Sequence, residues 1–341
     1  MILYLDDRNY KENIDRAAGV ITDGGLVAFP TETVYGLGAN ALSADAVSRI
    51  FTAKGRPQDN PIIVHVNGMT MAEQIAVFTD KAKDLADAFW PGPLSLVMEA
   101  TGLPSVVTAG LATVGVRMPD CDAALSLISA AGVPIAAPSA NKSGAPSPTL
   151  AAHVQSDLGD KILVLDAGES SIGVESTVID MTSSPPTILR PGAVTQQMIE
   201  QIIGKVDHAQ AFEAAEELKP ASPGMKYRHY APKAAVTVIE GNHISVAESI
   251  KYLYDKDIKA GDKPLVMASR ENKKYYGPRD LVITGSIHSP EQAAKVLYSL
   301  LRDADEKGYT SIYFEALPRV GIGFAVMNRI YKAAAYNIVK V

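Results

Sequence analysis

The chain has 341 residues, of which 47% are apolar and 21% charged, and its formal net charge at pH 7 is −6. This composition is typical of a soluble globular protein, and the length allows two or three domains with ordinary cores. The negative charge argues against a protein that coats nucleic acid by bulk electrostatics, although a local basic pocket is compatible with it. We expect no signal peptide and no membrane span, because the start turns acidic within six residues and no apolar run is long enough. The single cysteine, Cys121, excludes an internal disulfide, so we predict a cytoplasmic protein.

Residues 1–205 alternate between strand and helix signals. Apolar residues at helical spacing from Ile14 to Ile21 predict a helix that ends at Gly24 and Gly25. Apolar runs predict strands at residues 26–30, 62–66, 94–98, 114–118, 133–137, 162–165 and 177–181. Helices are expected near residues 43–54, 70–89, 121–131, 149–158 and 195–203. The uneven spacing predicts an α/β domain with one large, mixed, twisted sheet.

Residues 206–233 differ in character and predict an interdomain linker. The segment 212–219 is acidic and rich in alanine, and the prolines after it prevent a helix. Residues 225–232 then contain two tyrosines, a lysine, an arginine and a histidine, which is unusual for a spacer. We expect this segment to fold as a lid over a pocket of the first domain, with Tyr230 on a nucleotide and Lys226 or Arg228 facing phosphate. The alternative is a linker packed statically at the domain interface.

Residues 234–341 predict a second, smaller α/β domain. Strands are expected at residues 236–239, 264–268, 281–284 and 311–315, and helices at 245–255, 290–307 and 323–335. This simple alternation suits a parallel, Rossmann-like sheet.

The most informative stretch runs from Phe29 to Val66 and contains FPTETVYGLGANA and AKGRPQDNPIIVHV. Gly55 suits a helix C-terminus and Pro57 forbids its continuation, so we expect Lys54 and Arg56 on a fixed loop. Two cations beside glycines suit a polyanion such as a nucleotide. In isolation, however, a loop of this kind is more often a solvated turn.

Four further motifs place polar residues at or near the ends of apolar, strand-like runs. Arg117, in VRMP, is suited to bidentate pairing with a carboxylate, either of a ligand or of an internal Asp or Glu. Ser139 and Asn141, in APSANKSG, are candidates for binding an oxyanion, with an ordinary turn as the alternative. Glu175 and Arg190 complete the set, in GVESTV and LRPG. The histidines and the cysteine show neither metal-ligand spacing nor a catalytic signature.

Taken together, these motifs resemble the YrdC family, the L-threonylcarbamoyl-AMP synthases. The family's order is kept in FPTETVYGLGANA, AKGRPxxNPxIVHV, FWPGP, VRMP, APSANxSGxxSPT, GxESTV and LRPG. With SPGMKYRHYAP and a C-terminal α/β unit, the resemblance to the two-domain form covers the whole chain. Mild departures occur at Ser95, at Ala167 and at the Asp-Cys-Asp run around Cys121.

The resemblance implies that L-threonine, bicarbonate or CO2, and ATP give threonylcarbamoyl-AMP and pyrophosphate. A downstream transferase would use the product to modify tRNA next to the anticodon, and direct binding of tRNA by this chain is left open. Catalysis would rest on positioning and charge stabilisation. Mg²⁺ would be carried by ATP, without dedicated protein ligands.

The resemblance also implies residue roles. The catalytic set, expected at the triphosphate, is Lys54, Arg56, Ser139 and Asn141. The ATP-binding set is Arg56, Asn60, Thr113, Ser139, Ser147, Arg190 and Tyr230. The threonine-binding set is Thr33, His65, Arg117, Ala137 and Ser176. Two alternatives are an RNA-binding module of the same fold and a carbamoyl-transfer domain of hydrogenase maturation, which should come with acylphosphatase and zinc-finger segments.

Overall fold

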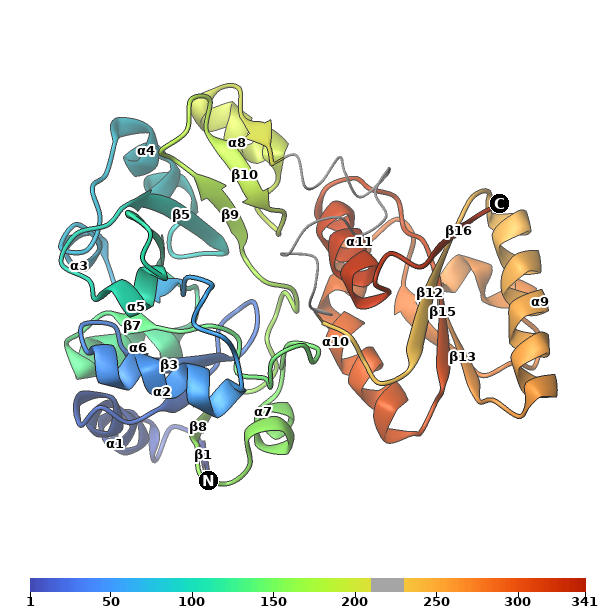
Figure 1. The fold of residues 1–341 in the computed structure, drawn as a ribbon, viewed down its shortest axis with the longest axis horizontal. Coiled ribbons are helices and arrows are strands. Elements are labelled where there is room, and N and C mark those ends of the chain that lie inside the picture. Colours follow the sequence, from blue (N-terminus) through green and yellow to red (C-terminus); the bar gives the residue numbers. More distant parts are fainter. Residues whose placement is uncertain (210–229) are drawn as a thin grey trace. The chain divides into compact units, whose positions relative to one another are not determined.

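The computed structural model describes residues 1–209 and 230–341, and the chain divides into two compact units. The first comprises Met1–Ser143 and Ser147–Gln210, and the second comprises Gly144–Pro146 and Ala211–Val341. Figure 1 shows both units along the chain. Lys226 and Arg228, which the lid hypothesis concerns, lie outside the described residues.

The first unit is built on one sheet of eleven strands in the order β1-β8-β2-β3-β7-β4-β6-β5-β9-β10-β11. The strands are β1 (Ile2–Tyr4), β2 (Val27–Phe29), β3 (Gly36–Asn40), β4 (Val64–His65), β5 (Leu94–Glu99), β6 (Thr113–Arg117), β7 (Ile135–Ala136), β8 (Leu163–Asp166), β9 (Thr177–Asp180), β10 (Thr187–Arg190) and β11 (Asp207–His208). Strand β2 pairs in parallel with β8 and antiparallel with β3. The predicted large mixed sheet is confirmed.

Helices cover this sheet on both faces. They are α1 (Tyr10–Thr22), α2 (Ala44–Lys54), α3 (Met69–Ala72), α4 (Asp80–Phe89), α5 (Ser105–Thr108), α6 (Asp122–Ala131), α7 (Ala151–Leu158) and α8 (Gln196–Ile203). Successive residues of β2 separate two cores: Val27 and Phe29 pack in the cluster under α1 and α6, while Ala28 joins the larger cluster on the other face. This alternation is the period of two that a strand imposes on its side chains.

One predicted helix is wrong in extent: residues 70–89 form α3 and α4 with an extended break between them. Within the break Ala76 bridges Ala100, and the Val77 N–H donates to the Glu99 carbonyl at 3.0 Å. These sheet contacts interrupt the helix. Thr79 starts the next one, because its side chain accepts a hydrogen bond from the Ala82 N–H.

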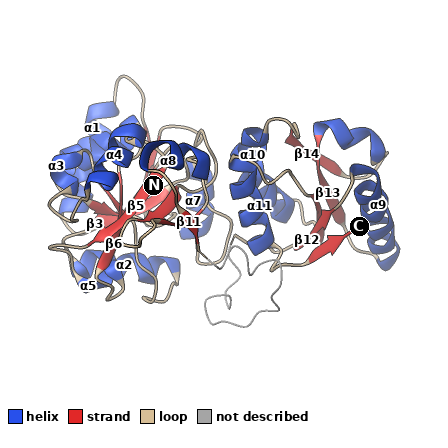
Figure 2. Cartoon of the chain, turned by 90° about the horizontal axis from the view of Figure 1, so that it is seen from above, coloured by secondary structure: helices blue, strands red, loops and turns tan. Residues whose placement is uncertain are grey.

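The second unit contains a five-stranded parallel sheet in the order β14-β13-β15-β12-β16. Its strands are β12 (Ala235–Glu240), β13 (Pro264–Ser269), β14 (Leu281–Gly285), β15 (Ser311–Glu315) and β16 (Ile338–Lys340). Helix α9 (His243–Ala260) lies on one face, and α10 (Pro290–Glu306) and α11 (Ile322–Ala333) lie on the other (Figure 2). A 3-10 helix, η4 (Arg270–Tyr275), follows β13. The predicted parallel sheet is confirmed, with β16 as an addition.

Within residues 1–209 and 230–341, none of the helices combines the length and the apolar character needed to cross a membrane.

Candidate active site

The turn at residues 31–35, between β2 and β3, is where the segments of the site converge. The carbonyl of Tyr35 accepts from the Ala140 N–H at 2.8 Å, which joins the turn to the loop after β7. The N–H of Tyr35 donates to the Pro148 carbonyl at 2.8 Å, and the Thr33 carbonyl accepts from the Gly173 N–H at 3.1 Å. Segments 137–148 and 172–176, distant in sequence, are therefore fastened to one turn.

Lys54 closes one side of this arrangement. Helix α2 begins at the capping side chain of Ser43 and ends at Gly55, whose φ of 62° is left-handed. This stop places Lys54 in the last turn with its side chain buried. Its ammonium donates to the carbonyls of Ser139 at 2.5 Å and Asn141 at 2.6 Å. Burial, and then the nearby charge of Arg56, lower the pKa of Lys54 to about 7.

Arg56 follows the helix stop and is half-buried. Its Nη2 donates to the Asn60 carbonyl at 3.3 Å, and its guanidinium carbon lies 6.0 Å from the centre of the Phe51 ring. Asn60 itself is exposed. The two cations of the predicted loop thus differ: Lys54 is buried against backbone carbonyls, whereas Arg56 reaches the surface.

Arg117, at the end of β6, is buried and bound at three points. Its Nη1 donates to Thr33 Oγ1 at 2.9 Å, and its Nε donates to the Gly92 carbonyl at 3.3 Å. Its Nη2 forms an ion pair with Glu32 Oε2 at 2.6 Å. The structure therefore supplies an internal carboxylate for this arginine, one of the two partners that the sequence left open.

His65 lies beside Arg117, because β4 and β6 pair in parallel with these two residues in register. The His65 ring is buried, with its centre 5.9 Å from that of Phe29 in an edge-to-face contact. Burial, followed by the positive charge of Arg117, lowers the pKa of His65 to about 3. The imidazole is consequently neutral at physiological pH.

Ser176 and Arg190 form a second polar pair. Arg190 Nη2 donates to Ser176 Oγ and its Nε to the Ser176 carbonyl, each at 3.0 Å. The Ser176 hydroxyl also shares a hydrogen bond of 2.8 Å with Ser95. Next to this contact, the pairing of β10 with β9 shifts its register between Ile188 and Arg190.

Gly192 allows the LRPG segment to approach this pair closely. A Cβ atom at position 192 would lie 2.3 Å from the Thr177 nitrogen and 2.7 Å from the Ser176 carbonyl carbon. Only glycine fits a backbone approach of that kind.

Ser147 and Glu175 are joined by a hydrogen bond of 2.6 Å, and both side chains are buried. Ala137 is also buried, and its N–H donates to the Ile63 carbonyl at 3.0 Å. Asn141 uses its side-chain amide to donate to the Lys142 carbonyl at 2.7 Å. These contacts set the backbone course of the loop from 137 to 147.

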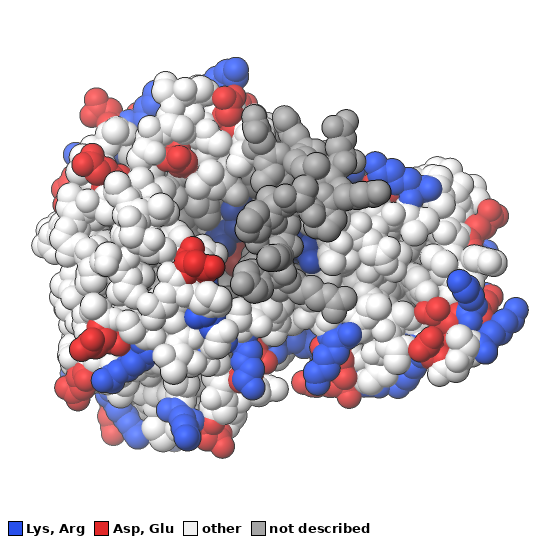
Figure 3. Space-filling model, in the orientation of Figure 1, with Lys and Arg blue, Asp and Glu red and all other residues white. Residues whose placement is uncertain are grey.

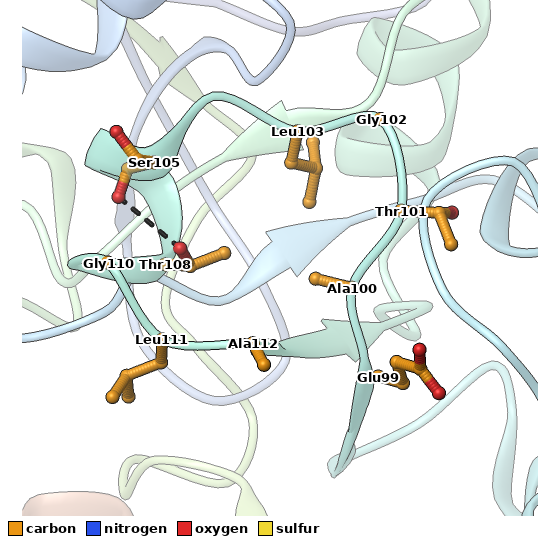
Figure 4. A pocket seen from close by; sticks show the side chains of 10 residues that line it. All are labelled: Glu99, Ala100, Thr101, Gly102, Leu103, Ser105, Thr108, Gly110, Leu111 and Ala112. Carbon is orange, nitrogen blue, oxygen red and sulfur yellow. Dashed lines mark hydrogen bonds between the residues drawn. The ribbon is translucent and has the colours of Figure 1, made fainter.

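Thr113, predicted to bind ATP, lies at the far end of β6 from Arg117, and Tyr230 is described within its own unit. Thr113 begins β6 and Arg117 ends it, so about 13 Å of strand separates them. The connection between β5 and β6 lines a cavity of about 280 Å³ (Figure 4), and Thr113 is the residue directly after the last lining residue, Ala112. Tyr230 belongs to the second unit, where its ring centre lies 5.6 Å from that of Tyr298.

Glu32 is the residue of the site to which the sequence reasoning gave no role. It sits between Thr31 and Thr33 in the polar turn, so its position was a usable signal.

Carboxylates and cations are interspersed over the face drawn in Figure 3. The described residues contain no group of three or more His, Cys, Asp or Glu side chains that could hold a metal ion.

The mixed sheet, the turn with its buried cations and the second parallel sheet define a two-unit α/β protein with a polar binding site in its first unit. Residues 19–192 match the Sua5/YciO/YrdC family model, described as telomere recombination. Residues 194–335 match the model of the threonylcarbamoyl-AMP synthase C-terminal domain.

Similar proteins agree with both matches. The threonylcarbamoyl-AMP synthase of Pyrococcus abyssi is 46% identical, over 100% of this chain and 99% of its own. That of Bacillus subtilis is 44% identical, over 96% and 94%. The crystal structure of P. abyssi Sua5 complexed with L-threonine has a TM-score of 0.92 at 46% identity and covers 100% of this chain and 99% of its own. The chain belongs to the threonylcarbamoyl-AMP synthase family.

Proposed function

We propose that this protein is a threonylcarbamoyl-AMP synthase, a nucleotidyltransferase that makes an adenylate from ATP, L-threonine and bicarbonate or CO2. The observation that supports the proposal most is the turn at 31–35, which gathers Arg117, Thr33 and the 137–148 loop in a chain whose full-length relatives bear this name. The substrates are anionic where they react, so a site with several cations is required.

The threonine pocket is proposed at Thr33, His65, Arg117, Ala137 and Ser176. Arg117 is the group suited to the carboxylate of the amino acid. His65, held neutral by burial, adds a polar contact without a further charge. The hydroxyls of Thr33 and Ser176 have fixed partners, since they bind Arg117 and Arg190 respectively.

The nucleotide is proposed to bind as MgATP, with Mg²⁺ entering as part of the substrate. Arg56, Asn60, Thr113, Ser139, Ser147 and Arg190 are the proposed contacts in the first unit, with Tyr230 added from the second. Lys54 is proposed to act at the same place, together with Asn141. Because its ammonium already binds the carbonyls of the 139–141 loop, Lys54 also orients the loop that meets the phosphates.

The reaction then follows from positioning. The threonine amine adds to CO2 and loses a proton, which gives a carbamate. A carbamate oxygen attacks the α-phosphorus, the bond to the β-phosphate oxygen breaks, and pyrophosphate leaves. The arginines stabilise the charge that accumulates on phosphate in the transition state, and no covalent enzyme intermediate is needed. A downstream transferase that modifies tRNA would consume the mixed anhydride, and we expect both steps in the cytoplasm.

The proposal is tested by identifying the product. Mass spectrometry of a reaction with ATP, L-threonine and bicarbonate should detect threonylcarbamoyl-AMP, and omission of any of the three should abolish it. Salt-dependent RNA binding without formation of this adenylate would favour the RNA-binding module instead.

A further inference from the structure

The ion pair between Glu32 and Arg117 lies inside the proposed threonine pocket. Both side chains are 5% exposed, and Glu32 Oε2 is 2.6 Å from Arg117 Nη2. The backbone of Glu32 is fixed as well, because its carbonyl accepts from the Ile172 N–H at 2.8 Å. The carboxylate is therefore held in place by the fold and is not a surface group that has folded inward.

The second oxygen of this carboxylate, Oε1, lacks a hydrogen-bond donor among the described residues. Glu32 Oε1 is buried, yet it accepts no hydrogen bond from any residue within 1–209 and 230–341. A buried carboxylate oxygen of this kind is costly unless a donor meets it. The oxygen is therefore suited to a ligand that brings its own hydrogen-bond donors.

A free amino acid carries the two charges that complement this pair. Its carboxylate matches the Arg117 guanidinium, and its ammonium has three N–H donors and no acceptor. A simple carboxylate that bound Arg117 would compete with Glu32 and leave that acidic side chain buried beside a second anion. A zwitterion avoids this, because it neutralises both members of the pair.

We propose that Glu32 binds the α-ammonium of the amino-acid substrate while Arg117 binds its carboxylate, so that the pair selects zwitterions over other carboxylates. This inference rests on the proposed function, since it assigns a further residue to the same pocket. Glu32 thereby places the nitrogen, which must release one proton to solvent and become a neutral amine before it adds to CO2.

Other groups near the pocket are less suited to the ammonium. The carboxylate of Glu175 accepts from Ser147 Oγ at 2.6 Å. The His65 ring is neutral and carries no compensating negative charge. The Cys121 thiol, close enough to Glu32 to feel its charge, has a raised pKa because it is buried, so it stays protonated.

The test compares L-threonine with 3-hydroxybutyrate, which is threonine with hydrogen in place of the amine, by calorimetric titration of the full chain. Glu32→Gln keeps the size of the side chain and removes its charge. This variant should bind threonine at least about thirtyfold more weakly, which is the scale of losing a buried charge partner. Its affinity for 3-hydroxybutyrate should be unchanged or higher. Glu315→Gln, a matched loss of a buried carboxylate in β15 of the second unit, should keep the affinity for threonine.

The outcomes are distinguishable. Unchanged or tighter threonine binding by Glu32→Gln would make Glu32 only a competitor for Arg117 and would overturn the inference. An equal loss of affinity for both ligands would also overturn it, because Glu32 would then act only by orienting the Arg117 guanidinium. If Glu32→Gln does not fold, Glu32→Asp must retain a preference for threonine over 3-hydroxybutyrate that a neutral Glu32→Ala loses. Absence of threonine binding by the unaltered protein would reject the proposed function itself.

Discussion

The ammonium nitrogen of Lys54 lies 2.5 Å from the carbonyl oxygen of Ser139, a residue 85 positions further along the chain. With the second bond to Asn141, this contact fastens the 139–141 loop to the end of α2. Lys54 therefore links the geometry of the proposed phosphate site to the stability of the first unit.

Replacing Lys54 by methionine should lower both stability and activity. The variant leaves two carbonyls without their charged donor, and each buried unsatisfied group costs about 1–3 kcal/mol. Urea denaturation followed by fluorescence of Trp90, the single tryptophan of the chain, reports on the first unit. Lys142→Met, at an exposed lysine of the same loop, serves as the control. A large loss of activity at unchanged stability would mean that Lys54 acts on phosphate alone.

Arg56→Ala should behave differently from Lys54→Met, because Arg56 is half-buried and lies after the end of α2, whereas the Lys54 side chain is buried within its last turn. We expect kcat/KM to fall by about a hundredfold or more, the scale of losing one charge-stabilising group, with the urea midpoint unchanged. Arg49→Ala, at an exposed arginine of α2, the helix that ends just before Arg56, controls for net charge. Near-native turnover of Arg56→Ala would remove this residue from the proposed triphosphate site.

His65 should make the first unit sensitive to acid. Its pKa is about 3 in the folded protein and 6.5 for an ordinary histidine, so between these values the unfolded chain binds more protons. The contribution of His65 to stability is complete above pH 6.5 and is lost as the pH falls toward 3. His65→Asn should reduce the slope of unfolding free energy against pH by up to about 1.4 kcal/mol per unit between pH 4 and 6. Identical slopes for the two proteins would show that His65 is not held neutral.

The proposed pocket should prefer threonine to serine. Losing the methyl group costs about 1–3 kcal/mol in a fitted apolar corner, which corresponds to roughly tenfold to two-hundredfold in the specificity constant. Competition of the two amino acids for adenylate formation measures the ratio directly. Equal specificity constants would contradict a closely fitted methyl pocket.

Tyr230→Ala should raise KM for ATP if the second unit contributes to the nucleotide site. The matched control is Tyr252→Ala, since that ring is 71% exposed on α9 of the same unit. Limited proteolysis with and without ATP and threonine tests the lid hypothesis in parallel. Full activity of Tyr230→Ala together with unchanged cleavage would leave the segment as a tether.

The sequence predicted the local elements well because their signals are local. Ser43 and Gly55 mark both ends of α2, and Arg117 is found at the end of its strand. The break between α3 and α4 could not be predicted, because it depends on the pairing of Ala76 with Ala100 in the sheet. Strand β3 was missed since the glycine-containing run Gly36–Asn40 lacks the branched residues typical of strands.

The contacts between side chains within the site could not be predicted from the sequence. Arg117 was recognised as an arginine that needs a carboxylate, but Glu32 is 85 residues away in the chain and only the fold brings it near. Similarly, Lys54 was expected on a loop facing phosphate, whereas the turn of α2 buries it against two carbonyls. Burial and long-range contacts decide such pairings, and neither is encoded by spacing.

Pyrophosphate release from ATP, measured with and without L-threonine and bicarbonate, tests whether this protein makes the adenylate. We expect release that requires both co-substrates and is lost in Arg56→Ala but retained in Arg49→Ala. Pyrophosphate release that is independent of threonine, or no release under any of these conditions, would contradict it.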